Sequence, residues 1–340
     1  MKAAIYNPYL DTLGGGERYT LSFARVLADS NFKVDLEWSN ELIRKKLEER
    51  FNINLMDINF VKSIKKGDGY DICFWVSDGS IPLLRARKNF LHFQIPFKDV
   101  GGKSLLNKMK LFRINKVICN SYFTKKFIDA EYGIDSIVVY PSVDILSIKP
   151  KKKENLILYI GRFSQLAQSK RQDILIKAFK MLLKKIEGFR LILAGGTEVG
   201  ADKYLARLKR SIGNTPVTII EDPSFEKLVS LYGRAKIFWS ASGYSENENK
   251  NPIKVEHFGI TLVEAMSAGC VPLAYDAGGH KEIIRDGKNG YLFNSVRDLV
   301  NKTQKLLMDK ITFKILADEA VRTSKLFCYE NFEKNIKNLL

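Results

Sequence analysis

The sequence predicts an α/β protein made of two doubly wound domains, each with a parallel sheet between helices. Short apolar runs alternate with longer amphipathic stretches, which is the pattern of repeated strand–helix units. The alternation occurs twice, and a polar, lysine-rich segment at 149–153 separates the two rounds. A length of 340 residues is large for one domain and ordinary for two. We therefore expect domains at 1–148 and 149–320, followed by a helical segment at 321–340.

The first round supplies the elements of the first domain. Its short apolar runs predict strands, and the amphipathic stretches between them predict helices. Strands are expected at 3–6, 33–37, 72–75, 89–93, 116–120 and 136–139, and helices at 16–28, 40–50 and 121–131.

The second round repeats the pattern with different residues, so the likeness between the halves is architectural. Ligands of open α/β sheets bind at the carboxyl ends of the strands, which directs attention to the residues that follow each strand. Strands are expected at 156–160, 190–194, 217–220, 237–240, 271–275 and 290–293, and helices at 171–186, 202–212, 225–234 and 260–268.

The formal net charge of +17 is unevenly distributed. Between 81 and 126 there are eleven Lys or Arg residues and a single acid, Asp99, for a net charge of +10. A field of this size attracts phosphates, nucleic acid or anionic lipid. A general enrichment in lysine would give the same total without any binding role.

Other features of the composition indicate the compartment. Four cysteines are scattered without a pairing or metal-binding spacing, which favours buried thiols in a reducing environment. No apolar run approaches the length of a membrane span, and the first residues enter a strand pattern instead of a signal-peptide core. We therefore expect a cytoplasmic protein.

The stretch 256–264 carries two carboxylates eight residues apart. Glu256 is expected in a loop, Gly259 at the start of a helix and Glu264 in the second turn of that helix. The N–H groups of 259–262 then lie at a helix N-terminus, which is an anion site. A phosphate bound there would be flanked by two acids that accept hydrogen bonds from hydroxyls. Phosphate together with hydroxyls is typical of a sugar nucleotide.

This motif resembles the donor site of retaining GT-B glycosyltransferases, in particular glycosyltransferase family 4. Within that family the chain is similar to mannosyltransferases of the dolichol pathway, with Gly-Gly-Gly-Glu-Arg at 14–18 and Glu-His-Phe-Gly-Ile at 256–260. The resemblance implies a GT-B fold in which the first domain binds the acceptor and the second binds the nucleotide sugar. It also implies that the C-terminal helix, 321–340, crosses back to the first domain.

The resemblance assigns a role to each residue of the motif. Glu256 contacts hydroxyls of the donor sugar near the reacting carbon, as a catalytic residue, and Glu264 binds the ribose hydroxyls. The turn and the phosphate-binding amides come from Phe258, Gly259, Ile260, Thr261 and Leu262. The alternative is a buried helix with two acids at this spacing by chance.

Two cations resemble the family's phosphate clamp. Arg162 follows a predicted strand, and Lys170 precedes the next helix. Arg suits bidentate binding of a diphosphate and Lys acts as a point charge, and both stabilise the negative charge of the leaving group. The loop is longer than is usual in the family, so Arg171 is an alternative to Lys170. A pair of solvated surface cations is the other interpretation.

Two features of the first half are also candidates. Gly14, Gly15 and Gly16 follow the first strand and open the first helix, where glycines allow close approach and the helix N-terminus favours anions. The resemblance implies that this loop borders the place where acceptor and donor phosphate meet, whereas a structural turn is the alternative. His92 ends an apolar strand run, and the resemblance implies a catalytic contact with the reacting sugar. A histidine packed in the core is the alternative.

An amphipathic stretch at 101–113 places Leu105, Leu106, Met109 and Phe112 on one helical stripe among lysines. This arrangement suits an interfacial helix on anionic lipid. The alternative is an ordinary helix that packs on its own sheet. The loop at 242–254 is long for the family, and both a lid and a surface insertion fit it.

No Asp-x-Asp pair occurs in the chain, so we expect no metal and no other cofactor. The sequence thus predicts a retaining glycosyltransferase that moves a hexose, such as mannose, from a GDP- or UDP-sugar. The acceptor is expected to be a glycan or a lipid-linked glycan, with peripheral contact to an anionic membrane. One alternative is another nucleotide-sugar enzyme of the same fold, such as an epimerase. The other is a basic nucleic-acid-binding protein, which would need basic repeats interleaved with aromatic residues.

Overall fold

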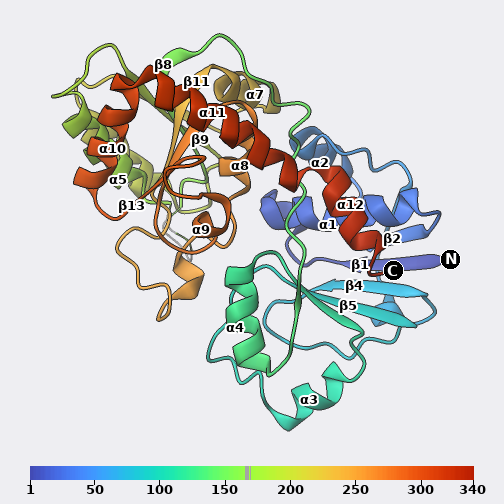
Figure 1. The fold of residues 1–340 in the computed structure, drawn as a ribbon. Helices are drawn as coiled ribbons and strands as arrows, with labels where there is room; N and C mark the ends of the chain where they lie inside the picture. The colour runs from blue at the N-terminus through green and yellow to red at the C-terminus, as the bar shows by residue number, and fades with distance from the viewer. Residues whose placement is uncertain (165–167, 169) are drawn as a thin grey trace. The chain divides into compact units, whose positions relative to one another are not determined.

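The computed structural model describes residues 1–164, 168 and 170–340, and it divides the chain into two compact units. The first unit comprises Met1–Ser142 together with Tyr329–Leu340, and the second comprises Val143–Cys328. Each unit contains one parallel sheet with helices on its faces (Figure 1), which confirms the predicted fold class. The predicted boundaries at 148 and 320 lie close to these divisions.

The first unit is built on a seven-stranded sheet with the order β3-β2-β1-β4-β5-β6-β7. From β1 the chain builds outward through β2 and β3, then returns to the other side of β1 with β4. The switch point therefore lies between β1 and β4. The elements are β1 (Lys2–Tyr6), α1 (Gly15–Asp29), β2 (Lys33–Glu37), α2 (Ile43–Phe51), β3 (Ile58–Val61), β4 (Ile72–Val76), β5 (Lys88–Phe93), α3 (Leu105–Leu111), β6 (Lys116–Cys119), α4 (Tyr122–Tyr132), β7 (Ile137–Val138) and α12 (Tyr329–Lys337).

The last helix, α12, completes the core of the first unit and lies beside α1 (Figure 1). Phe332 and Ile336 of α12 belong to the same buried cluster as Tyr19 and Phe23 of α1. The ring of Phe332 packs edge-on against Tyr19, with centroids 5.1 Å apart. Burial of an apolar side chain of this size contributes about 1.5–3 kcal/mol, so the two residues hold the C-terminus on this unit.

The second unit is built on a six-stranded parallel sheet with the order β10-β9-β8-β11-β12-β13. Its switch point lies between β8 and β11. The elements are β8 (Glu154–Ile160), α5 (Gln172–Leu182), β9 (Arg190–Gly195), α6 (Asp202–Ile212), β10 (Val217–Glu221), α7 (Phe225–Arg234), β11 (Ala235–Ser240), α8 (Ile260–Ser267), β12 (Val271–Tyr275), α9 (His280–Ile283), β13 (Tyr291–Phe293), α10 (Val296–Met308) and α11 (Lys310–Ser324).

The core of this unit centres on β11, where Trp239 is fully buried. Its indole N–H donates to the hydroxyl of Thr303 on α10 at 3.1 Å, so the polar atom of the ring is satisfied. Sequence analysis did not predict β3, α10 or α11. Among the described residues, no helix has both the length and the apolar character needed to cross a membrane.

Candidate functional site

Two turns of the second unit meet at the carboxyl edge of its sheet, where β8 and β9 end. Gly161 and Arg162 follow β8, and β9 ends at Gly195. A Cβ on Gly195 would lie 2.1 Å from the carbonyl oxygen of Gly161, so only glycine fits at this close approach. Ligands of open α/β sheets bind at this edge, and most of the predicted donor residues lie on the turns around it.

Of the two predicted phosphate-binding cations, Arg162 has a more exposed side chain than Lys170. Its guanidinium Nη1 lies 2.7 Å from Oε1 of Glu198, and 44% of the Arg162 side chain is exposed. An ion pair this exposed contributes about 0–1 kcal/mol. The guanidinium is thus positioned by Glu198 while it remains accessible from solvent.

Lys170 and Glu256 form a mostly buried ion pair. The Lys170 Nζ lies 2.8 Å from Oε2 of Glu256, and the side chains are 12% and 16% exposed. Lys170 also donates to Oε1 of Gln168 at 2.6 Å. Gln168 in turn donates to the carbonyl of Val255 at 2.6 Å. The predicted clamp lysine and the first acid of the motif are therefore neighbours.

Arg171 is directed to other partners. Its backbone is left-handed, with φ of 51°. Its guanidinium bonds to the carboxylate of Asp173 at 3.1 Å and to the carbonyl of Tyr244 at 2.7 Å. Lys170, and not Arg171, therefore forms the ion pair with Glu256.

The surroundings of Glu256 keep its carboxyl group ionised. Burial favours the neutral acid and would raise the pKa of Glu256. Burial is the largest single effect, but the combined effects of Lys170, His280 and His257 outweigh it and lower that pKa from 4.5 to about 2. The carboxylate is therefore charged at neutral pH and accepts hydrogen bonds.

His280 is a buried neighbour of this carboxylate that sequence analysis missed. Burial lowers the pKa of His280, and the opposing effect of Glu256 is smaller. Its Nδ1 lies 2.9 Å from the carbonyl of Tyr275, which accepts only, so Nδ1 carries the proton. Its Nε2 then accepts from the hydroxyl of Ser240 at 3.1 Å. His280 is a neutral structural support behind Glu256.

The helix predicted over 260–268 is α8, and it begins after Gly259. The φ of Gly259 is 117°, a conformation that side chains rarely adopt. The N–H of Leu262 donates to the Gly259 carbonyl at 3.1 Å, so a phosphate contact of this amide stays a prediction. The amides of Ile260 and Thr261 donate to no described residue, so they are the anion donors that this helix offers.

The remaining motif residues are held from within the second unit. Oε2 of Glu264, in the second turn of α8, accepts from the hydroxyl of Tyr232 at 2.7 Å. Phe258 is buried and packs edge-on against Phe327, with ring centroids 5.3 Å apart. His257 bonds through Nε2 to the Ile253 carbonyl at 3.1 Å.

The loop at 242–254 is tied to the helix that follows β12. Oε2 of Glu248 accepts from the N–H of Gly278 at 2.7 Å, and its Oε1 lies 2.6 Å from the Nζ of Lys281. The hydroxyl of Tyr244 accepts from the N–H of Val296 at 3.3 Å. These contacts are those of a packed surface insertion.

In the first unit, the Gly14–Gly16 loop is occupied by local contacts. Oε2 of Glu17 accepts from the N–H of Gly14 at 2.6 Å, as the cap of α1. A Cβ on Gly16 would lie 1.8 Å from Oε1 of Gln94, so a larger residue there would displace the end of the Gln94 side chain. Gly15 forms the first turn of α1 with Gly16. The structural interpretation of Gly14 and Gly16 therefore has direct support.

His92 lies in the core of the first unit and has no exposed surface. Its ring stacks on Tyr19, with centroids 3.9 Å apart, and its Nδ1 lies 3.1 Å from the carbonyl of Ile118. Burial lowers the pKa of His92 to about 3, so the ring is neutral. The carbonyl of His92 accepts from Ser77 at 2.9 Å. The ring and the carbonyl of His92 thus both have contacts within the first unit.

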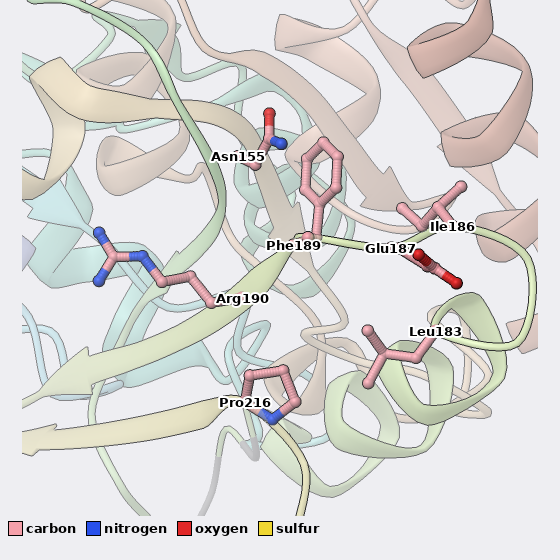
Figure 2. A pocket seen from close by; sticks show the side chains of 8 residues that line it. Asn155, Leu183, Ile186, Glu187, Phe189, Arg190 and Pro216 are labelled. Atoms are coloured by element: carbon pink, nitrogen blue, oxygen red, sulfur yellow. The ribbon is translucent and has the colours of Figure 1, made fainter.

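A cavity of about 540 Å³ lies at the opposite edge of the second sheet (Figure 2). Asn155, Arg190 and Pro216 line it at the amino ends of β8, β9 and β10. None of the predicted site residues lines this cavity. Because ligands of such sheets bind at carboxyl ends, we do not assign the site to it.

Several supporting residues gave no signal in the sequence. Glu198 and Tyr232 contact predicted residues from other elements, and an isolated Glu or Tyr has no distinctive spacing. His280 follows a glycine pair after β12, which is the one local signal that marks it. Within the described residues, no group of three or more His, Cys, Asp or Glu side chains is arranged to hold a metal ion. Independence of metal stays a prediction.

The sequence model of the family described as "Glycosyl transferases group 1" matches residues 144–323, more than half of the chain. The GDP-Man:Man(3)GlcNAc(2)-PP-Dol alpha-1,2-mannosyltransferase of Dictyostelium discoideum is 26% identical, over 62% of this chain and 44% of that protein. The D-inositol 3-phosphate glycosyltransferase of Rhodococcus erythropolis is 25% identical, over 73% of this chain and 58% of that protein. The chain thus spans about half the length of these two relatives.

An uncharacterized glycosyltransferase of Methanocaldococcus jannaschii is 25% identical over 99% of this chain and 96% of that protein. Among solved structures, HepE of Anabaena in complex with UDP and glucose has a TM-score of 0.78 at 18% identity, over 99% of this chain and 98% of that chain. Sucrose-phosphate synthase of Thermosynechococcus elongatus has a TM-score of 0.74 at 16% identity, over 100% of this chain and 98% of that chain. These likenesses confirm the predicted GT-B fold.

Proposed function

Because the chain belongs to the group 1 glycosyl transferases, we propose that it transfers a hexose from a nucleotide-diphosphate sugar to a glycan or lipid-linked acceptor. The observation that carries the proposal is the pair Lys170–Glu256, 2.8 Å apart, beside the N-terminus of α8. It combines a cation for phosphate with an ionised acid for hydroxyls. The name of one relative gives GDP-mannose, and HepE was solved with UDP and glucose. Both support a nucleotide-sugar donor.

In this proposal the donor diphosphate is bound by two cations and two amides. Arg162 and Lys170 contribute the positive charge. The N–H groups of Ile260 and Thr261, at the N-terminus of α8, donate hydrogen bonds to the phosphate. The buried Phe258 and the left-handed Gly259 fix the turn that aims these amides.

Two acids recognise hydroxyl groups of the same donor. Glu256 accepts hydrogen bonds from the sugar, since its low pKa keeps it ionised at neutral pH. Glu264 accepts from the ribose, with Tyr232 fixing one of its oxygens at 2.7 Å. The name of one relative contains mannose, and the solved structure of HepE contains glucose, so we propose mannose or glucose as the donor sugar.

The reaction that we propose retains the configuration of the sugar and uses no metal. The bond from the anomeric carbon to the diphosphate oxygen breaks, and the acceptor oxygen bonds to that carbon on the same face. The acceptor proton moves to the departing phosphate oxygen. Arg162 and Lys170 stabilise the charge that grows on the diphosphate, which is the role a bound metal has in other transferases.

We propose that the first unit binds the acceptor near the Gly14–Gly16 loop. We also propose that the protein acts in peripheral contact with a membrane. A catalytic role of His92 stays a prediction. The complete burial of its side chain does not support that role. The family match does not favour the epimerase or the nucleic-acid-binding alternative.

The donor is tested by thermal shift of the full chain with GDP-mannose, UDP-glucose and ADP-glucose. A donor at a hundred times its Kd stabilises the folded state by about 2.7 kcal/mol. The stabilising sugar is then used in a transfer assay, with NMR of the anomeric proton and with a chelator. Retention and unchanged activity in chelator are expected.

The site is tested with Glu256→Gln, and Glu246→Gln in the neighbouring loop serves as the matched control. We expect loss of transfer by at least a hundredfold in the first variant and none in the control. Unchanged transfer by Glu256→Gln, with the fold intact by circular dichroism, refutes the assignment. Interconversion of the donor sugar without an acceptor would indicate an epimerase instead.

A further inference from the structure

Helix α3 of the first unit exposes four apolar side chains to solvent. Leu105 is 75% exposed, Leu106 and Met109 are each 61% exposed, and Phe112 is 90% exposed. Leu105, Met109 and Phe112 recur at intervals of four and three residues, so they lie on one face of the helix. α3 lies at the periphery of its unit, well apart from α1 and α12 (Figure 1).

This apolar face has no packing role within the unit. None of the residues of α3 is buried, and only Leu111 reaches the edge of a core cluster. A helix this short is marginal by itself in water. The four exposed apolar side chains therefore do not stabilise the fold, and their exposure needs another explanation.

The base of α3 is nevertheless firmly held. The carboxylate of Glu131 accepts from the N–H groups of Asp99, Val100 and Gly102 at 2.8, 3.1 and 2.8 Å. The hydroxyl of Ser104 caps the helix by accepting from the N–H of Asn107 at 3.3 Å. The loop and cap fix the helix so that its apolar face points outward.

The sequence around the apolar face is predominantly basic, and the acids Asp99 and Glu131 lie at the base of the helix. Residues 100–128 contain six lysines, one arginine and no acid. Lys108 and Lys110 flank the apolar face on either side, and Arg113 follows it. A predominantly basic rim around an apolar stripe complements an anionic plane such as the surface of a bilayer.

We propose that α3 is a membrane-docking surface that binds an anionic lipid bilayer, with Leu105, Met109 and Phe112 entering the interface. The rim of lysines then contacts lipid phosphates, and the apolar side chains lie among the upper acyl chains. This proposal rests on the proposed function in one respect, which is the expectation that the acceptor is carried by lipid. Binding itself needs no sugar donor.

The test is flotation of the full chain with vesicles in the absence of any nucleotide sugar. Vesicles of phosphatidylcholine with phosphatidylglycerol are compared with vesicles of phosphatidylcholine alone, at about 0.1 M salt, where the screening length is ~10 Å. We expect binding to the mixed vesicles that is at least tenfold stronger and that weakens as salt rises. Because transfer is measured separately on a soluble acceptor, failure of docking and failure of catalysis are distinguishable.

The variant Met109→Ser/Phe112→Ser should bind the mixed vesicles at least tenfold more weakly. The matched control is Ile311→Ser/Ile315→Ser on α11, a pair that is 75% and 60% exposed beside lysines in the second unit. The control variant should bind as the unchanged chain does. Absence of binding to anionic vesicles overturns the proposal, as does an equal loss in both variants. Self-association of the chain that disappears in the α3 variant also overturns it, because it assigns the face to a second copy.

Discussion

Replacing Glu256 by glutamine should destabilise the second unit at neutral pH, and the difference should shrink in acid. Burial alone would raise the pKa of Glu256, but Lys170, with His280 and His257, lowers it from 4.5 to about 2. A carboxylate whose pKa is lower in the folded state stabilises the fold above its unfolded pKa. That contribution is lost as the pH falls from about 4.5 through about 2.

The size of the effect follows from the same pKa values. The gap between 4.5 and about 2 corresponds to about 3 kcal/mol, at 1.36 kcal/mol for each pKa unit. This is an upper bound on the pH-dependent free energy, because the Glu256 side chain keeps 16% of its surface exposed. The glutamine also leaves the Lys170 ammonium without its carboxylate. We expect Glu256→Gln to lower the free energy of unfolding by about 1–3 kcal/mol at neutral pH.

The assay is urea unfolding of the full chain, followed by circular dichroism at several pH values between neutrality and acid. The quantity compared is the difference in unfolding free energy between the unchanged chain and Glu256→Gln. Glu221→Gln is the matched control, since Glu221 pairs with Lys209 at 2.6 Å with side chains that are 36% and 56% exposed. Such a pair contributes about 0–1 kcal/mol.

A double-mutant cycle with Lys170→Met separates the pair from the rest of its surroundings. A coupling of about 1–3 kcal/mol is expected, as for residues in direct contact. The reasoning is refuted if the coupling is near zero, or if Glu256→Gln costs the same at neutral and acid pH.

Three further predictions concern the supports of the site. Tyr232→Phe removes the donor that lies 2.7 Å from Glu264, so it should cost about 0.5–1.5 kcal/mol in urea unfolding and weaken donor binding in calorimetry. An unchanged donor Kd would contradict the role given to Glu264. Gly16→Ala places a Cβ 1.8 Å from Oε1 of Gln94 and should lower stability by less than about 1 kcal/mol, because the flexible end of Gln94 can move, with recovery in the double variant with Gln94→Ala. No recovery would show that Gln94 is not the obstacle. Gly259→Ala, at a φ of 117°, should cost about 1–3 kcal/mol in thermal unfolding, and an unchanged melting temperature would count against the strain.

The central strands of both sheets could be predicted because they are buried on two faces and therefore read as apolar runs. The edge strand β3 could not, since only Ile58 of its four residues is buried. α11 was also missed. Its apolar residues Ile311 and Ile315 face solvent, so its pattern does not mark a single buried stripe.

The motif at 256–264 could be predicted because its chemistry is local: a helix N-terminus and two acids at a fixed spacing. The partners of these groups could not be predicted, since Glu198 and Tyr232 reach the site through the fold. The case of His92 shows the limit of the strand-end argument. Side chains alternate between the faces of a strand, and position 92 faces Tyr19 of α1 in the core.

The ion pairs of the site indicate how a diphosphate would bind. Each cation is paired with one acid, Arg162 with Glu198 and Lys170 with Glu256, so the four side chains together carry no net charge. In the proposed donor site, a diphosphate competes with these acids for the two cations, and loss of the Lys170 contact would leave Glu256 available to the hydroxyls of the sugar. If the proposed site is correct, recognition of the phosphate and recognition of the sugar are coupled through the Lys170–Glu256 pair.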